Sequence, residues 1–257
     1  MSEKSDLDRY EWLDPAERWL TDSFRVVETI QGFLFMDVDM TRPRVLVERL
    51  REKGIRATYN HLFVRAAALA LSRLPDLHVM VIGSRRLRPG QVDIGLSVAG
   101  QTNFAPVMVI EDAGRKTLAQ LAEEVTRRVP EVQEKEKKDL DGMRRLGWII
   151  PFGWLRRWIV RRVLSSFRIR RQLSGTFQIS CLAVDAVVPM VLSTAAGLGV
   201  GRVRDRVVAV DGQVVVRPMA TLACMIDHKV WDGVRAMVMA NAVKKILEEG
   251  ELEAEAG

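Results

Sequence analysis

The sequence has few of the residues that build disulfide frameworks, metal sites or membrane spans. It contains two cysteines, Cys181 and Cys224, and both stand in apolar, strand-like runs. We expect them to be buried small side chains, which fits a reducing cytoplasm. No apolar run reaches the ~18–20 residues that cross a bilayer, and the N-terminus is too polar and acidic for a signal peptide. The spacing of histidines and cysteines does not resemble a zinc site, so no metal is expected.

Phosphate-binding loops are missing as well. The glycine-rich run at 195–202 lacks the G-x-G-x-x-G spacing of dinucleotide-binding turns. No lysine followed by a hydroxyl residue comes after it, as a P-loop would require. These absences exclude the common nucleotide-binding motifs and leave the glycines with another task.

The composition is that of one large α/β domain. The chain has 257 residues, of which 48% are hydrophobic and 28% are charged, and it contains no internal repeat or obvious domain boundary. Predicted strands outnumber helices and some are joined by hairpins, so we expect a mixed sheet. The strands are predicted at 33–40, 77–82, 92–99, 104–110, 175–182, 207–216 (a hairpin turning at Asp211-Gly212) and 219–226, and the helices at 15–24, 41–50, 59–74, 118–129 and 234–247.

Charge is spread unevenly along the chain. The net charge is +6, but residues 143–171 contain nine arginines and no acidic residue, whereas the tail at 249–257 is strongly acidic. A basic block of this kind is typical of proteins that bind nucleic acid, an anionic ligand or an anionic membrane.

The most informative short motif is His228 followed four residues later by Asp232 and Gly233. The chain has only three histidines, and this one lies between a strand-like run and a helix-like run. A histidine at such a junction can extend a ring nitrogen into a cleft as a general base. The pattern alone is short, so a histidine that merely bonds local backbone groups stays an open alternative.

Five ordered segments of the chain resemble the catalytic domains of 2-oxoacid dehydrogenase acyltransferases. The segments are 60–71 with 74–77, 92–99 with 105–122, 175–180, 199–202 and 227–233, and the resemblance extends over roughly residues 30–248. Because the segments occur in the same order as in that family, the match is far more specific than the histidine motif.

This resemblance implies the fold of chloramphenicol acetyltransferase. That fold is an α/β (α+β) arrangement, a mixed β-sheet flanked by helices, assembled as homotrimers with active sites between subunits. It also implies acyl transfer between coenzyme A and a thiol acceptor of the dihydrolipoamide type. Two rivals remain: a non-catalytic trimeric scaffold of the same fold, and an acetyltransferase that acts on a small hydroxyl compound.

The same resemblance assigns roles to three residues. His228 is the general base that takes the thiol proton, a task that suits imidazole near pH 7. Ser180 is the hydroxyl that donates a hydrogen bond to the tetrahedral oxyanion, a contribution of typically ~2.7–4 kcal/mol. Asp232 is the carboxylate that maintains the site. From the residues alone, Ser180 could instead be bonded to a neighbouring strand and Asp232 could be a helix N-cap. His61 and His78 match no catalytic position and are expected to be structural.

The chain departs from the family pattern in its layout. We expect a single catalytic domain over 1–257, with an N-terminal extension at 1–28, a basic tryptophan-rich insertion at 143–171 and the acidic tail at 249–257. No lipoyl or peripheral-subunit-binding domain is expected, so a lipoyl group would arrive in trans on another protein. Trp231 occupies a place where the family usually has an aliphatic residue, which could reshape the thiol pocket.

The insertion carries the largest difference. From Trp154 onward, apolar residues recur with helical period, and the arginines 156, 157, 161 and 162 are predicted to lie mainly on another face. Tryptophan with arginine on an amphipathic helix is typical of an interfacial membrane anchor, here through 147–168. A helix packed on the enzyme core or on a neighbouring subunit, with arginines near coenzyme A phosphates, explains the pattern equally well. Nucleic-acid binding is not expected, because the arginines alternate with bulky apolar residues. A cytoplasmic enzyme, peripheral to a membrane if the anchor is real, is the resulting expectation.

Overall fold

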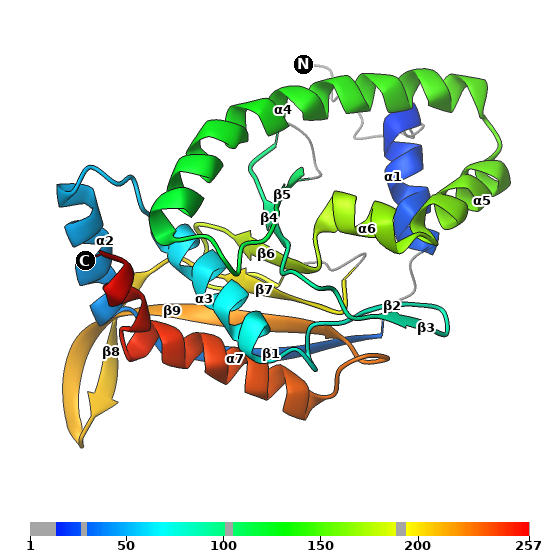
Figure 1. Cartoon of the computed structure of the whole chain (residues 1–257). Helices are drawn as coiled ribbons and strands as arrows, with labels where there is room; N and C mark the ends of the chain where they lie inside the picture. Colours follow the sequence, from blue (N-terminus) through cyan, green and yellow to red (C-terminus); the bar gives the residue numbers. More distant parts are fainter. Residues whose placement is uncertain (1–13, 27–29, 101–104, 189–193, 257) are drawn as a thin grey trace, which may run out of the picture.

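A computed structural model describes residues 14–26, 30–100, 105–188 and 194–256, and its centre is a seven-stranded sheet (Figure 1). The strands run in the order β1-β9-β7-β6-β4-β5, and β8 pairs with β9 outside this path. The bounds are β1 Gln31–Asp39, β4 Ile94–Ser97, β5 Val107–Ile110, β6 Phe177–Cys181, β7 Ala196–Val200, β8 Arg204–Val210 and β9 Gln213–Asp227, with β2 Met80–Ile82 and β3 Arg85–Leu87 in a separate hairpin.

The sheet is mixed, as predicted. Strand β6 runs parallel to both of its neighbours, β4 and β7, whereas the pairs β1–β9, β7–β9 and β4–β5 are antiparallel. The glycine-rich run forms β7, whose residues are all buried, so these glycines belong to the sheet and not to a phosphate loop.

The predicted hairpin at 207–216 is confirmed. Asp211 and Gly212 both have positive φ, at 51° and 79°, which is the conformation of a two-residue type I′ turn. The second strand does not end near 216, however. Strand β9 is 15 residues long and includes the strand predicted separately at 219–226. One strand therefore connects the projecting hairpin with the centre of the sheet.

Helices α3 (Tyr59–Arg73) and α7 (Gly233–Glu248) pack against the sheet, with α2 (Thr41–Glu52) beside them (Figure 1). The prediction that the alanine-rich helix is buried on most sides is confirmed, since ten residues of α3 are buried. Small side chains such as Ala66, Ala67 and Ala70 allow the helix to approach its neighbours closely.

Helix α4 (Leu118–Ile149) arcs over the sheet and reaches well beyond it (Figure 1). It starts with a reciprocal cap between Thr117 and Gln120, and it contains Pro130. Proline removes one backbone hydrogen bond and is a common cause of helix bending. The helix nevertheless continues beyond the proline, through the strongly charged segment 131–141. In the described parts of the chain, no helix is both long and apolar enough to cross a membrane.

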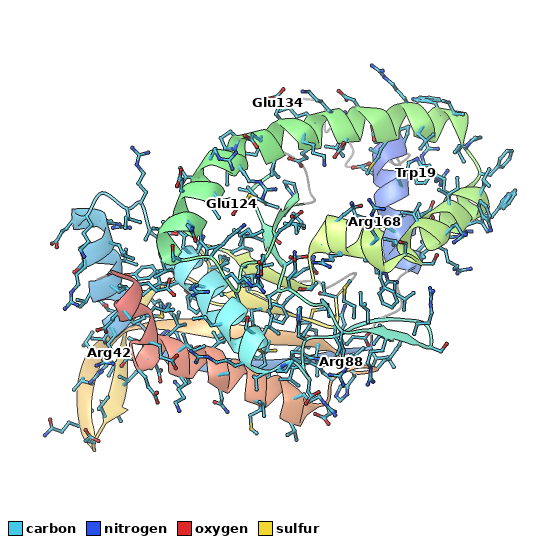
Figure 2. All side chains as sticks on the ribbon, in the orientation of Figure 1. Trp19, Arg42, Arg88, Glu124, Glu134 and Arg168 are labelled. Carbon is cyan, nitrogen blue, oxygen red and sulfur yellow. The ribbon has the colours of Figure 1, made fainter. Side chains whose placement is uncertain are left out.

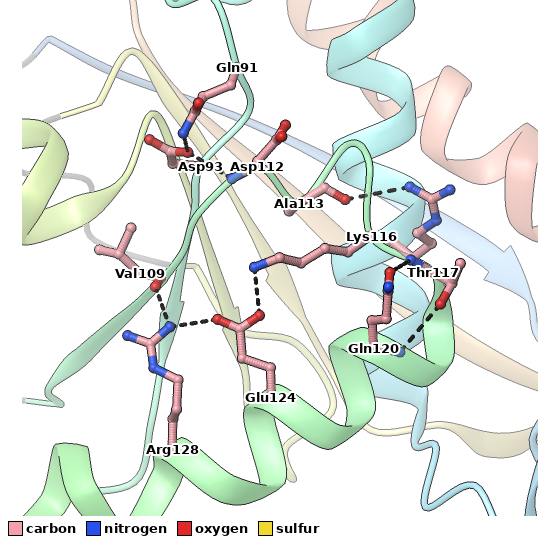
Figure 3. A network of polar contacts seen from close by, with 11 residues as sticks. Gln91, Asp93, Val109, Asp112, Ala113, Lys116, Thr117, Gln120, Glu124 and Arg128 are labelled. Atoms are coloured by element: carbon pink, nitrogen blue, oxygen red, sulfur yellow. Dashed lines mark hydrogen bonds and ion pairs between the residues drawn. The ribbon is translucent and has the colours of Figure 1, made fainter.

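A polar network around Glu124 connects the first turns of α4 with the sheet (Figure 3). The Glu124 carboxylate accepts hydrogen bonds from Lys116 at 2.6 Å and from Arg128 at 2.7 Å. Arg128 also donates to the carbonyl oxygen of Val109 on β5 at 2.9 Å. Partial burial acts to raise the pKa of the Glu124 carboxyl, but the hydrogen bonds and charges of Lys116 and Arg128 together lower it below its usual value.

The N-terminal extension and the predicted insertion together form a small helical cluster. It contains α1 (Pro15–Val26), the end of α4, α5 (Gly153–Leu164) and α6 (Phe167–Ser174), and much of it stands apart from the sheet (Figure 1). Trp19, Val160 and Leu164 form its own apolar centre, separate from the main core. Helix α5 therefore docks on α1 of the same chain.

Arg156 lies on the packed side of α5, away from Trp154 and Trp158. Its side chain is buried and donates to the buried Asp22 carboxylate at 2.8 Å and to the carbonyl oxygen of Pro151 at 2.7 Å. Trp154 and Trp158, which belong to the apolar series predicted from the helical period, are exposed, and Val160 and Leu164 form the packed side of α5 instead. The orientation of α5 follows from the Asp22 carboxylate on α1, because its ion pair allows the Arg156 guanidinium to be buried. The spacing of apolar residues along α5 gives no sign of this partner.

The acidic tail folds back on the body as a short 3₁₀ helix, Glu251–Ala256. Glu255 pairs with Arg65 of α3 at 2.7 Å and accepts a hydrogen bond from the backbone N–H of Leu118 at 2.8 Å. Glu251 pairs with Arg73 at 2.7 Å. The tail thus joins the end of α3 to the start of α4.

Candidate active site

His228 lies at the first position of the turn that follows β9. Its backbone N–H donates to the carbonyl oxygen of Ile30 at 2.7 Å and so extends the pairing of β9 with β1. The N–H groups of Val230 and Trp231 both donate to the carbonyl oxygen of Asp227, at 2.8 and 3.0 Å, which closes the turn. The His228 side chain is exposed, and its ring nitrogens have no hydrogen-bond partner within the described residues.

Gly32 of β1 supports the imidazole ring. A β carbon placed on Gly32 would lie 3.0 Å from Cδ2 of His228 and 3.1 Å from Cγ1 of Ile226. Any side chain at position 32 would therefore compete with the ring for space. Sequence reasoning missed this residue, although an isolated glycine in a strand is a known sign of close approach.

Asp232 is the N-cap of α7, as one of the two interpretations predicted. One carboxylate oxygen accepts from the backbone N–H of Arg235 at 2.8 Å, and the other pairs with its guanidinium at 3.0 Å. The backbone hydrogen bond from Arg235 is the largest cause that lowers the pKa of Asp232. Among the described residues, the carboxylate is bonded within its own helix start and not to His228.

Ser180 lies on β6, half-buried, and its hydroxyl has no hydrogen-bond partner in the portions of the chain that are described. The alternative of a serine bonded to a neighbouring strand is therefore not what the structure contains. Its hydroxyl is available to donate to a substrate oxygen, which is what an oxyanion donor requires.

Strand register separates Ser180 from His228 within one chain. Ser180 pairs with Gly199, and Gly199 pairs with Ala223, which precedes His228 by five residues along β9. Because strands rise about 3.4 Å per residue and lie about 4.8 Å apart, the two residues are roughly 20 Å apart. One chain does not bring His228 and the Ser180 hydroxyl together.

Trp231 does not lie beside the base, contrary to the suggestion that it reshapes the thiol pocket. It is only 1% exposed and packs against Phe177, with ring centroids 6.5 Å apart. Its ring fills the core beneath the turn that carries His228. An aromatic ring anchored in this way gives the turn a rigid base.

Arg170 of the insertion interacts electrostatically with Asp227, next to the turn that carries His228. Burial lowers the pKa of Arg170 on α6, and the negative charge of Asp227 opposes this shift. Asp227 directly precedes His228, so α6 places a cation near the turn that carries His228. Arg170 also donates to the carbonyl oxygen of Leu164 at 2.6 Å, which fixes its side chain.

The other two histidines are structural, as expected. The Nδ1 atom of His61 accepts from the backbone N–H of Thr58 at 3.1 Å and caps α3. His78 contacts the hydroxyl of Thr176 at 2.7 Å. Burial lowers the pKa of each to about 4, so both rings are neutral at pH 7.

The cysteines are free thiols whose pKa values burial raises to about 12. Thiols of this kind are poor nucleophiles. In the described ranges, no group of three or more histidine, cysteine or acidic side chains could hold a metal ion.

Comparison with known proteins gives a consistent result. The family model of the 2-oxoacid dehydrogenases acyltransferase catalytic domain matches residues 20–143 and 172–253. The chain is 30% identical over 206 residues to the dihydrolipoyllysine-residue succinyltransferase component of the 2-oxoglutarate dehydrogenase complex of Cupriavidus necator. That alignment covers 77% of this chain and 41% of the relative, so the chain spans about two fifths of the length of such relatives.

Solved structures with the same fold include the dihydrolipoamide acetyltransferase of Azotobacter vinelandii, with a TM-score of 0.73 at 20% identity. That match covers 98% of this chain and 96% of the other. A chloramphenicol acetyltransferase matches with a TM-score of 0.51 at 14% identity, over 94% and 98% of the two chains. The predicted fold class is therefore confirmed.

Proposed function

Because the chain belongs to the family of 2-oxoacid dehydrogenase acyltransferase catalytic domains, we propose that it transfers an acyl group between coenzyme A and a thiol. The acceptor in this proposal is a dihydrolipoamide group offered by a lipoyl-bearing protein. The names of the curated relatives, which are dihydrolipoyllysine succinyltransferases, support a substrate of this class.

In the proposed reaction, His228 acts as the general base. Its ring nitrogen takes the proton of the thiol, and the sulfur attacks the carbonyl carbon of the acyl thioester. The tetrahedral oxyanion accepts a hydrogen bond from the hydroxyl of Ser180. Collapse of the intermediate expels the other thiolate, which recovers the proton from the imidazolium. Two observations on the described residues support these roles: the exposed ring of His228 and the hydroxyl of Ser180 have no hydrogen-bond partner among them.

The active site is proposed to form between two copies of the chain, within a homotrimer. The observation that carries this proposal is the separation of roughly 20 Å between His228 and Ser180 in one chain. An exposed valine surface on the β8–β9 hairpin (Val207, Val214 and Val216, at 67–78% exposure) also suits burial against a second copy.

Asp232 has a supporting role in this scheme, because its cap fixes the start of α7 next to the His228 turn. The Azotobacter structure comes from a study of three residues in the catalytic mechanism of that enzyme: a serine, a histidine and an asparagine. The asparagine follows the histidine by four residues. His228 and Asp232 have the same spacing. Both asparagine and aspartate are good N-caps, which favours a structural task for position 232.

We further propose that residues 14–256 form one catalytic domain and that residues 144–171 are an insertion within it. The family match stops at 143 and resumes at 172, and α5 and most of α6 fall in this interval. Two free cysteines suit the reducing cytoplasm as the site of action.

The test is complementation between two inactive variants. His228→Ala and Ser180→Ala are each expected to lose acyl transfer from acetyl- or succinyl-coenzyme A to dihydrolipoamide by about 10²-fold or more. When the two variants are unfolded and refolded together, sites that receive both intact residues should recover about a quarter of wild-type activity.

The outcomes separate the alternatives. A refolded mixture that stays inactive would contradict a site shared between copies. If wild-type protein transfers an acyl group to no acceptor, the non-catalytic scaffold is the remaining hypothesis. If it acylates only small hydroxyl compounds, the rival acetyltransferase activity is correct.

A further inference from the structure

Large apolar side chains gather at the end of the α4–α5 hairpin and face solvent. Here they are called the tryptophan tip, which consists of Trp148, Ile149, Phe152, Trp154 and Trp158, each 60–76% exposed. Three of the six tryptophans of the chain belong to it. Figure 2 shows side chains that project from the outer side of this hairpin, whereas Trp19 lies on the inner side on α1. A contiguous apolar surface of this kind requires an explanation.

Among the described residues, the packed side of α5 is the side opposite the tryptophan tip. On the inner side of α5, Val160 and Leu164 are buried against Trp19. The buried ion pair between Arg156 and Asp22 fixes the rotation of α5. Because that pair holds Arg156 inward, the helix must present Trp154 and Trp158 outward.

Positive charge surrounds the tip. Residues 143–171 contain nine arginines and no acidic residue. Several of these arginines are bonded within the cluster, but Arg145 and Arg161 are exposed and no carboxylate partner of either is found among the residues described. The outer surface of the hairpin thus combines exposed indole rings with unpaired guanidinium groups.

We propose that the tryptophan tip binds the surface of an anionic phospholipid bilayer. Indole and phenyl rings are favoured at the boundary between headgroups and acyl chains, and nearby arginines interact with lipid phosphates. The charged side chains that residues 143–171 contribute are all basic, which complements the negative phosphates of such a bilayer. The occupant that matches both features is a negatively charged membrane.

The position of the tip allows membrane contact without blocking assembly. In Figure 1 the α4–α5 end lies far from the β8–β9 hairpin, on the opposite side of the molecule. A bilayer bound at the tip would leave the exposed valines of the hairpin available to a second copy. The proposal therefore does not depend on the acyltransferase activity or on trimer formation.

The test is co-sedimentation of the full chain with vesicles. Vesicles of phosphatidylcholine alone are compared with vesicles that also contain phosphatidylglycerol. We expect sedimentation with the anionic vesicles, weak sedimentation with the neutral ones, and release at high salt. The tryptophan emission should shift to shorter wavelength as the rings enter the lipid.

Two sets of variants locate the binding surface. The triple variant Trp148→Ser, Trp154→Ser and Trp158→Ser should reduce partitioning by about tenfold or more, while Val45→Ser on α2, a partly exposed apolar control, should not. The pair Arg145→Gln and Arg161→Gln should lower it by about thirtyfold. The matched control is Arg49→Gln with Arg51→Gln, two exposed arginines of α2.

Wild-type protein that fails to sediment with anionic vesicles would overturn the proposal. Sedimentation that is unchanged in the triple tryptophan variant would do the same. A third outcome is that wild-type protein does not bind the vesicles, while light scattering shows that the triple variant forms an assembly of different mass. In that case the tip binds a second copy of the chain. His228→Ala should sediment like wild type, so loss of catalysis and loss of membrane binding are distinguishable.

Discussion

The ring of His228 lies on the bare backbone of Gly32, with Cδ2 only 3.0 Å from where a β carbon would be. Strand β1 thus contacts one side of the imidazole ring of the proposed base. Because the backbone N–H of His228 also donates to Ile30, both the main chain and the ring depend on the same strand.

Gly32→Ala is therefore expected to push the imidazole away from its position. A displacement near 1 Å at a reacting group can cost about 10²-fold in rate, so kcat should fall by this order while the melting temperature changes little. Gly90→Ala, at a position where a β carbon meets nothing within 4 Å, is the control. Equal kcat in both variants would argue against a role of the Gly32 contact in catalysis.

Asp232 offers a way to separate a cap from a catalytic charge. Asp232→Asn keeps an oxygen that accepts from the Arg235 N–H, so it should retain stability and most activity. Asp232→Ala removes the cap and should lower the free energy of unfolding by about 1 kcal/mol. Thermal melts and steady-state kinetics of both variants check this. A large loss of kcat in Asp232→Asn would show that the negative charge itself is required.

The buried pair of Asp22 and Arg156 should behave asymmetrically. Asp22→Ala leaves a buried guanidinium without its carboxylate and should destabilise the helical cluster by about 3 kcal/mol or more. The double variant Asp22→Leu with Arg156→Met replaces both charges with apolar groups and should be close to neutral. Hydrogen exchange of α5 amides measures the effect locally. Equal protection in Asp22→Ala and wild type would contradict it.

Stability should depend on pH because of His61 and His78. Burial lowers the pKa of each to about 4, so between pH 6.5 and 4 the unfolded chain binds protons that the folded chain does not. The free energy of unfolding therefore decreases as the pH falls through this range, by roughly 3 kcal/mol per histidine at its lower end.

His61→Gln tests this dependence without loss of the cap. A glutamine oxygen can accept from the Thr58 N–H, just as Gln120 accepts from Thr117 at the start of α4. The variant should match wild type at pH 7 and lose less stability at pH 5 in urea titrations. Parallel curves for the two proteins would show that His61 does not contribute to the acid sensitivity.

Local patterns predicted most of the elements. The hairpin at Asp211-Gly212 follows from a turn that requires positive φ, and the buried helix α3 follows from its run of alanine and apolar residues. Sequence reasoning also placed His228 at the end of a strand. These features depend on residues that are neighbours in the chain, which is why the sequence alone suffices for them.

Contacts between distant residues could not be anticipated in this way. The inward position of Arg156 depends on Asp22, which lies on another helix, and the support of His228 depends on Gly32 on another strand. The separation of Ser180 from His228 follows from strand register across three strands. Periodicity describes one element at a time, whereas these relationships arise only when elements meet.

The pairing of α1 with α5 also sets an order of events during synthesis. Asp22 emerges from the ribosome more than a hundred residues before Arg156. Until then, α1 has neither the partner for its carboxylate nor the surface that covers Trp19. Helix α1 would therefore pack late, and until the second half of the chain is made the nascent protein would expose the apolar ring of Trp19, to which chaperones can bind.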